Sequence, residues 1–76
     1  MITVRMFGIV AEKTGCSVLD LSFEGDTVQL EAWLQLNYPQ LKGIKYALAV
    51  NKKIIHIATL LKHGDEIALL PPFSGG

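Results

Sequence analysis

Residues 26–39 read DTVQLEAWLQLNYP and carry the longest helical pattern in this chain of 76 residues. Asp26 or Thr27 can accept hydrogen bonds from the free amides of a first helical turn. Gln29 stands three residues after Asp26, which is the position of a capping-box partner. Pro39 predicts that the regular helix ends near Asn37 or Tyr38, since proline removes a backbone donor and restricts the residue before it.

The predicted helix is apolar on more than one side. One stripe at helical spacing consists of Leu30, Trp33, Leu34, Tyr38 and Leu41. A second stripe beside it consists of Val28, Ala32 and Leu36. We therefore expect one side of the helix to pack in the core and another to be available to a partner.

Strand patterns flank this helix on both sides. Alternation of apolar and polar residues predicts strands over residues 2–7, 18–24, 46–50, 54–55 and 66–70. Val10 to Thr14 can form a short helix that Gly15 closes. The stretch from Ala58 to Lys62 is expected to be irregular or to form one helical turn. Pro71 and Pro72 end the last strand.

The element order predicts an α+β fold with two layers, in which one main helix lies across one face of a mixed sheet of four to five strands. We expect residues 1–76 to form a single domain. The first and last strands are expected to lie side by side near the centre of the sheet, which is the β-grasp (ubiquitin-like) arrangement.

Composition narrows the functional class. Half of the residues are apolar, and seven basic side chains balance seven acidic ones. A neutral, apolar chain is neither a disordered tail nor a good candidate for nucleic-acid binding. So high an apolar content in so short a chain predicts apolar surface for a partner. No membrane span or signal peptide is visible, so a soluble cytoplasmic protein is expected.

The chain contains none of the common catalytic motifs: it has no GxSxG nucleophile motif, no P-loop, no GxGxxG dinucleotide motif and no HExxH zinc motif. His56 and His63 match no compact metal pattern, and the single cysteine, Cys16, has no evident base beside it. Asp65 and Glu66 should point to opposite faces of a strand. The lysines of the second half, Lys42, Lys45, Lys52, Lys53 and Lys62, are expected to be solvated.

The segment Pro71-Pro72-Phe73-Ser74-Gly75-Gly76 is the strongest functional candidate. Two prolines stiffen its start, and two glycines leave its tip without side chains. Fully extended, residues 72–76 reach about 17 Å. This flexible C-terminal tail (residues 71–76) could enter a narrow tunnel in another protein and present its α-carboxylate there. The alternative is an ordinary frayed terminus.

These features together resemble the ubiquitin-like sulfur carriers of the MoaD/ThiS family, and among them the small subunits of molybdopterin synthase. The resemblance runs over the whole chain and is most specific in residues 64–76, GDEIALLPPFSGG. The opening residues 4–8 (VRMFG), with Glu12 and Gly15, and the segments 26–28, 38–39 and 47–51 also resemble the family. Ala11 departs from it, because many members have arginine there.

The resemblance implies that Gly76 is the reactive residue. A MoeB-like partner would use ATP and magnesium to adenylate the Gly76 carboxyl, and a sulfur donor would convert it to a thiocarboxylate. A MoaE-like large subunit, in a heterotetramer of two small and two large subunits, would then receive the tail. The sulfur would be transferred to cyclic pyranopterin monophosphate, which builds the dithiolene of molybdopterin.

On this interpretation the chain is not an enzyme on its own and binds no permanent cofactor or metal. We expect it to dock near Phe7, Leu69 and Phe73, which flank the tail. Three alternatives stay open: a carrier for thiamin thiazole or amino-acid synthesis, a ubiquitin-like protein modifier, and a non-catalytic interaction domain.

Overall fold

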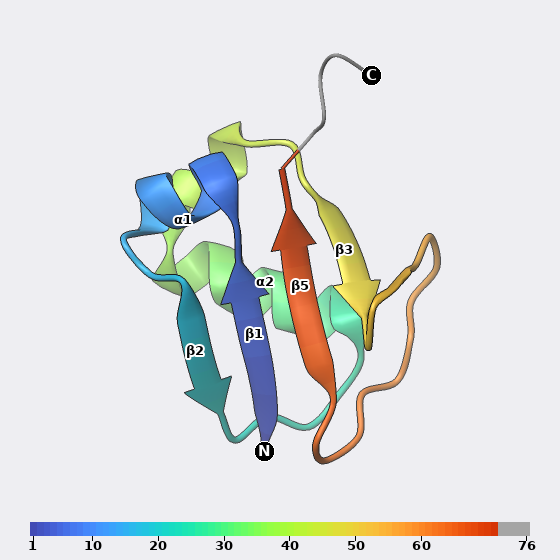
Figure 1. Cartoon of the computed structure of the whole chain (residues 1–76). Coiled ribbons are helices and arrows are strands. Elements are labelled where there is room, and N and C mark those ends of the chain that lie inside the picture. The colour runs from blue at the N-terminus through green and yellow to red at the C-terminus, as the bar shows by residue number, and fades with distance from the viewer. Residues whose placement is uncertain (72–76) are drawn as a thin grey trace.

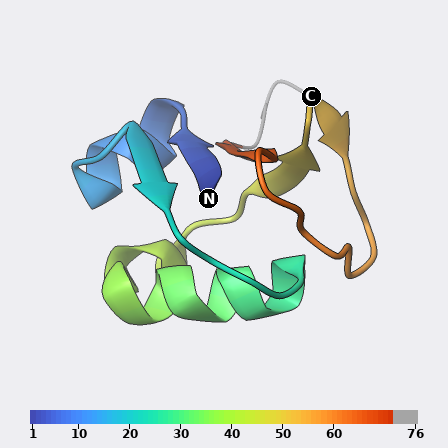
Figure 2. The ribbon, with the colours of Figure 1, turned by 90° about the horizontal axis from the view of Figure 1, so that it is seen from below.

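The fold is built on one mixed β-sheet. The computed structural model describes residues 1–71 of the chain. Within that range the strands lie in the order β2-β1-β5-β3-β4. Their bounds are Ile2–Met6 (β1), Val18–Leu21 (β2), Ala47–Val50 (β3), Lys53–Ile54 (β4) and Glu66–Leu70 (β5). The helical elements are Gly8–Thr14 (α1), Thr27–Asn37 (α2) and the 3-10 helix Pro39–Gly43 (η1). The strands lie in front of α2 in Figure 1, and Figure 2 shows α2 along one face of the sheet.

The centre of the sheet is the parallel pair of the first and last strands. Val4 of β1 lies opposite Ile67 of β5, and Met6 lies opposite Leu69. On the outer sides, β1 pairs antiparallel with β2, and β5 pairs antiparallel with β3. The predicted β-grasp arrangement, with the two chain-distant strands side by side, is thereby confirmed.

The capping box predicted for α2 is present. The backbone N–H of Gln29 donates to Asp26 Oδ1 at 2.9 Å, and the backbone N–H of Asp26 donates to Gln29 Oε1 at 2.9 Å. Gly25 has a φ of 139°, and a Cβ there would collide with the Gln29 side chain, so only glycine suits this position. The helix ends at Asn37, before Pro39, as predicted.

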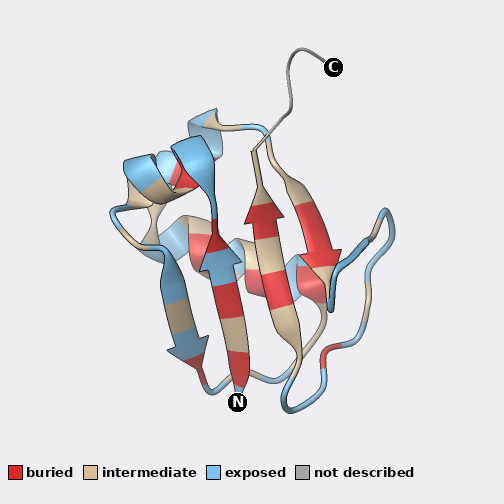
Figure 3. Ribbon diagram, in the orientation of Figure 1, coloured by how far each residue is buried: buried red, intermediate tan, exposed pale blue. Residues whose placement is uncertain are grey.

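The core fills the space between α2 and the sheet. Every second residue of β1 and β5 is buried, as the alternating bands of Figure 3 show. Leu30 and Leu34 of α2 are also fully buried. The buried hydrophobic cluster consists of Ile2, Val4, Met6, Val10, Leu21, Leu30, Leu34, Leu41, Leu48, Leu61, Ile67 and Leu69.

Several element bounds differ from their predictions: α1 begins at Gly8 rather than Val10, β4 spans Lys53–Ile54 rather than residues 54–55, and β1 and β3 are each one residue shorter. Strand β2 ends at Leu21 rather than continuing to residue 24, because Leu21 pairs with Ile2 at the start of β1 and no partner strand extends further. Residues 58–62 are irregular, which is the first of the two alternatives predicted for them. They lie beside the start of α2, where Thr27 N–H donates to Thr59 O at 3.0 Å and Leu61 N–H donates to Gly25 O at 2.9 Å. Over residues 1–71 no helix has the length and apolar character that crossing a bilayer requires.

Candidate functional site

The base of the predicted tail lies at the end of the central strand β5. Leu70, the last residue of this strand, lies opposite Ala47 of β3. On the other side, the Phe7 backbone N–H donates to Leu69 O at 3.3 Å, which extends the pairing of β1 and β5 by one residue. Pro71, which is half-buried, follows directly. Because β5 is held by β1 up to Leu69 and by β3 up to Leu70, its pairing sets where the tail begins.

The predicted site residues Pro72, Phe73, Ser74, Gly75 and Gly76 lie outside the described residues. Their roles therefore stay predictions. Of the tail as predicted, the structure places only its first residue, Pro71.

Of the three predicted docking residues, Phe73 lies outside the described residues, and Phe7 and Leu69 have different outcomes. Phe7 follows β1 and is 43% exposed, so its side chain is accessible to a partner. Leu69 is 0% exposed, and its prediction as a surface residue is wrong. It lies opposite Met6 and Leu48 on the α2 side of the sheet, where it is part of the core. Since successive strand residues point to opposite faces, its neighbours Ala68 and Leu70 occupy the other face instead.

The face of the sheet away from α2, called here the outer face, combines apolar and polar residues. Near the tail it carries small or apolar side chains, which we call the tail-proximal patch: Phe7, Ala47, Ala68 and Leu70. At the edges of the same face, Val18 is 48% exposed and Ile54 is 54% exposed. Sequence reasoning missed Ala68 and Leu70, although period-two alternation from a buried Ile67 would have found them.

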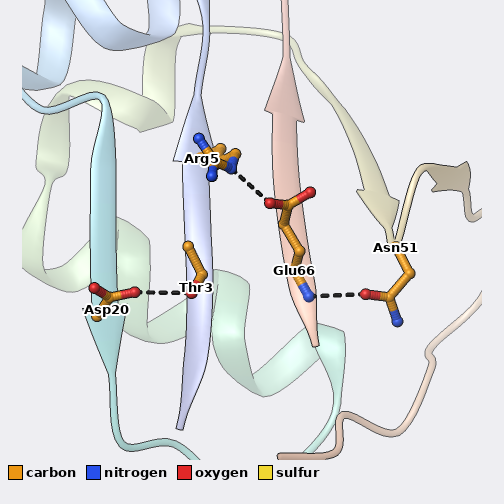
Figure 4. A network of polar contacts seen from close by, with 5 residues as sticks. All are labelled: Thr3, Arg5, Asp20, Asn51 and Glu66. Atoms are coloured by element: carbon orange, nitrogen blue, oxygen red, sulfur yellow. Dashed lines mark hydrogen bonds and ion pairs between the residues drawn. The ribbon is translucent and has the colours of Figure 1, made fainter. Parts of the chain in front are cut away.

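Further from the tail, the outer face is covered by polar contacts between strands (Figure 4). Arg5 Nε donates to Glu66 Oε2 at 2.6 Å, and Thr3 Oγ1 donates to Asp20 Oδ1 at 2.8 Å. The Glu66 backbone N–H donates to Asn51 Oδ1 at 2.9 Å. These contacts join β1 to β2, β1 to β5, and β5 to the turn after β3, so this part of the face is polar where the tail-proximal patch is apolar.

The groups with shifted pKa values are not assembled into a catalytic set. Burial raises the pKa of Tyr46, whose hydroxyl donates to Glu31 Oε1 of α2 at 3.1 Å. A hydrogen bond from the Asn51 side chain lowers the pKa of Asp65, which lies at the end of β5 away from the tail. Burial also raises the pKa of Tyr38. Within residues 1–71, His, Cys, Asp and Glu side chains form no group of three that could hold a metal ion.

The remaining candidates lie apart from one another. His63 Nδ1 lies 2.7 Å from the backbone nitrogen of Met1. Cys16 Sγ lies 3.3 Å from the carbonyl oxygen of Val18. His56 is exposed in the loop after β4. The geometry therefore brings no nucleophile and base together in the described part of the chain.

A β-grasp domain whose central strand leads directly into a Pro-Pro and Gly-Gly tail defines a class of ubiquitin-like carrier proteins. The sequence matches the ThiS family over residues 4–76, and the chain belongs to that family. It is 35% identical to a molybdopterin synthase sulfur carrier subunit of Arabidopsis thaliana, over 99% of this chain and 82% of that protein.

Solved structures agree with this placement. The complex of subunits 1 and 2 of the molybdopterin-converting factor from Helicobacter pylori contains a chain 34% identical to this one. The two chains superpose with a TM-score of 0.75, covering 99% of this chain and 97% of the other. The small archaeal modifier protein 1 of Methanosarcina acetivorans is 30% identical, with a TM-score of 0.82 over 99% of this chain and 95% of that one.

Proposed function

We propose that this protein is the sulfur carrier subunit of a molybdopterin synthase and that its working group is the carboxyl of Gly76. The observation that carries the proposal is the direct continuation of the central strand β5 into residues 71–76, PPFSGG, in a chain that is similar throughout to a sulfur carrier subunit. Residues 72–76 can reach about 17 Å beyond the sheet when extended.

The chemistry at Gly76 requires activation by another protein. A carboxylate is a poor acyl donor, because its leaving group would be an oxide. A MoeB-like enzyme using ATP and magnesium would form an acyl-adenylate at Gly76 and release pyrophosphate. A sulfide donor attacks the acyl carbon and displaces AMP, which gives the thiocarboxylate directly. A persulfide donor instead gives an acyl disulfide, which a second thiol cleaves to the thiocarboxylate and a disulfide. The thiocarboxylate sulfur is anionic near neutral pH and is a strong nucleophile.

The acceptor is expected in a MoaE-like large subunit. That subunit would bind cyclic pyranopterin monophosphate and move the protons, while this chain supplies sulfur, reach and a docking surface. The solved complex of subunits 1 and 2 from Helicobacter pylori supports a partner of this kind. In a heterotetramer of two small and two large subunits, each large subunit would receive the tail of one small subunit.

The docking surface proposed here is the tail-proximal patch rather than Leu69. Phe7 is exposed and Leu70 is partly exposed beside the base of the tail, and a partner that receives the tail covers the adjoining sheet face first. Apolar contacts in this patch would bring the partner's tunnel into line with the tail.

Intact mass spectrometry after incubation with the activating enzyme, ATP and a sulfide source tests the carrier chemistry. We expect one oxygen to be replaced by one sulfur, and the fragment carrying it to include Gly76. Adding the large subunit and the pterin precursor should yield molybdopterin and regenerate the carboxylate.

Gly76→Ala, or one residue added after Gly76, should leave folding unchanged and abolish sulfur transfer. Gly43→Ala is the matched control, because a Cβ at Gly43 has no heavy atom within 4 Å. Normal product yield from either tail variant would refute the assignment of Gly76.

A second candidate function is protein modification, which the similarity to a small archaeal modifier protein favours. In that case Gly76 would be joined to lysine side chains of target proteins. Isopeptide conjugates on a denaturing gel would support it. A third, a carrier for thiamin thiazole or amino-acid synthesis, would be revealed by the acceptor that the purified thiocarboxylate converts.

A further inference from the structure

The turn between β1 and α1 places a glycine against the first residue of the tail. Gly8 has a φ of 54°, in the left-handed region. A Cβ built on Gly8 would lie 3.0 Å from Cγ of Pro71, 3.6 Å from its Cβ and 3.9 Å from its Cδ. The Pro71 ring therefore lies directly over the bare Cα of a residue that is 63 positions earlier in the chain.

Neither side of this contact can move away freely. On the Gly8 side, the Phe7 N–H donates to Leu69 O at 3.3 Å, and the Val10 N–H donates to Phe7 O at 3.1 Å. These two hydrogen bonds fix the start of α1. On the Pro71 side, the preceding Leu70 is paired with β3, and the proline ring fixes its own φ near −65°. A side chain on Gly8 would thus push mainly on the Pro71 ring.

We propose that Gly8 is a positioning residue, which sets the direction in which the tail leaves the sheet by providing the surface on which Pro71 rests. This inference rests on the proposed function, because the direction of the tail matters only if a partner must receive it. Gly8 contacts no substrate and acts through Pro71. It differs from the tail-proximal patch, whose side chains would contact the partner directly.

The chain offers a matched control for this proposal. Gly15 also has a positive φ, 72°, and a Cβ there would have no heavy atom within 4 Å. Alanine at either position carries the strain of a left-handed backbone conformation. Only Gly8→Ala adds a contact with the tail, so the difference between the two variants isolates that contact.

The contact itself can be tested in the isolated protein. A nuclear Overhauser effect between the Gly8 Hα protons and the Pro71 ring protons is expected in the natural chain. Its absence would overturn the proposal whatever the function of the protein.

The functional test compares sulfur transfer by the natural carrier, Gly8→Ala and Gly15→Ala with a MoaE-type large subunit and the pterin precursor. If a displaced Pro71 ring leaves the tail in the direction that the partner accepts for only about a third to a tenth of the time, the apparent affinity should fall on the order of 3- to 10-fold. We expect Gly8→Ala to raise the carrier concentration needed for half-maximal rate by that factor. The rate at saturation should not change, because the bound tail is held by the partner.

A double variant separates positioning from general destabilisation. Pro71→Ala removes Cγ and Cδ and leaves only the Cβ, which would lie 3.6 Å from a Cβ on residue 8, an ordinary van der Waals contact. Adding Gly8→Ala to Pro71→Ala should therefore have no larger effect than adding Gly15→Ala. If Gly8→Ala acted only by reducing the amount of folded protein, its effect would be the same in the natural chain and in Pro71→Ala.

The outcomes distinguish the two levels of the proposal. A natural carrier that transfers no sulfur overturns the proposed function and, with it, the role of Gly8 in partner entry. If the natural carrier is active but Gly8→Ala and Gly15→Ala behave alike, only the positioning role is overturned.

Discussion

Leu69 and Leu70 are adjacent leucines, and replacing each by alanine should affect a different property of the protein. Leu69 is 0% exposed and lies between Met6 and Leu48 in the sheet, on the α2 side. Leu70 is only partly buried and belongs to the tail-proximal patch. Leu69→Ala should therefore destabilise the fold, whereas Leu70→Ala should mainly weaken binding to the partner that receives the tail.

The burial of Leu69 sets the expected size of the effect. Replacing a fully buried leucine by alanine costs about 3–5 kcal/mol, since the lost transfer free energy adds to that of the cavity left behind. A domain of this length has a total unfolding free energy of roughly 4–11 kcal/mol. The substitution should thus lower Tm by more than about 10 °C. For Leu70→Ala we expect a loss of about 1 kcal/mol or less, because its side chain is partly solvated already.

Urea denaturation of both variants measures the free energy of unfolding, and titration with the large subunit at a temperature where both are folded measures affinity. We expect unchanged affinity for folded Leu69→Ala and weakened affinity for Leu70→Ala. Equal destabilisation by the two substitutions, or weaker binding only in Leu69→Ala, would refute the assignment of these side chains to opposite faces of β5.

Two further predictions concern stability. Asp26→Ala removes the acceptor for Gln29 N–H and should lower the free energy of unfolding by about 1 kcal/mol in urea titrations, whereas a change below about 0.3 kcal/mol would mean that the capping box contributes little. The pKa of Asp65 is lowered chiefly by the hydrogen bond from Asn51, so its charged form stabilises the fold above its unfolded pKa, and this contribution is lost as pH falls through the lower folded pKa. The stability advantage of the natural chain over Asp65→Asn should therefore shrink between about pH 5 and pH 2, and an advantage that is constant over that range would contradict the shift.

Local patterns were sufficient for most of the elements. The helix from Thr27 to Asn37 was predicted with its capping box, because a cap, its partner three residues later and a following proline are all local signals. The last strand, Glu66–Leu70, was predicted with its observed bounds, since a glycine turn precedes it and prolines follow it. Strand β2 was predicted too long, because its end depends on the length of its partner strand β1.

The candidate site was only partly predictable. Phe7 is exposed, so its docking role stays a prediction, while the assignment of Leu69 to the surface was wrong. Alternation from the charged Glu66 and the apolar Ile67 would have placed Leu69 on the buried face, but its position beside the tail was given more weight. Pairing with Met6 and Leu48 confirms that Leu69 faces the helix.

The amino-acid sequence by itself determined the element order, the caps and the composition of the tail, because each depends on residues close together in the chain. Only the tertiary structure decided which residues flank Leu69 in the core and which residue lies under Pro71. Both depend on the parallel pairing of β1 with β5, whose residues are separated by some 63 positions in the chain. No local propensity encodes the register of such a pair, since it is set by packing the apolar faces of the whole sheet against α2.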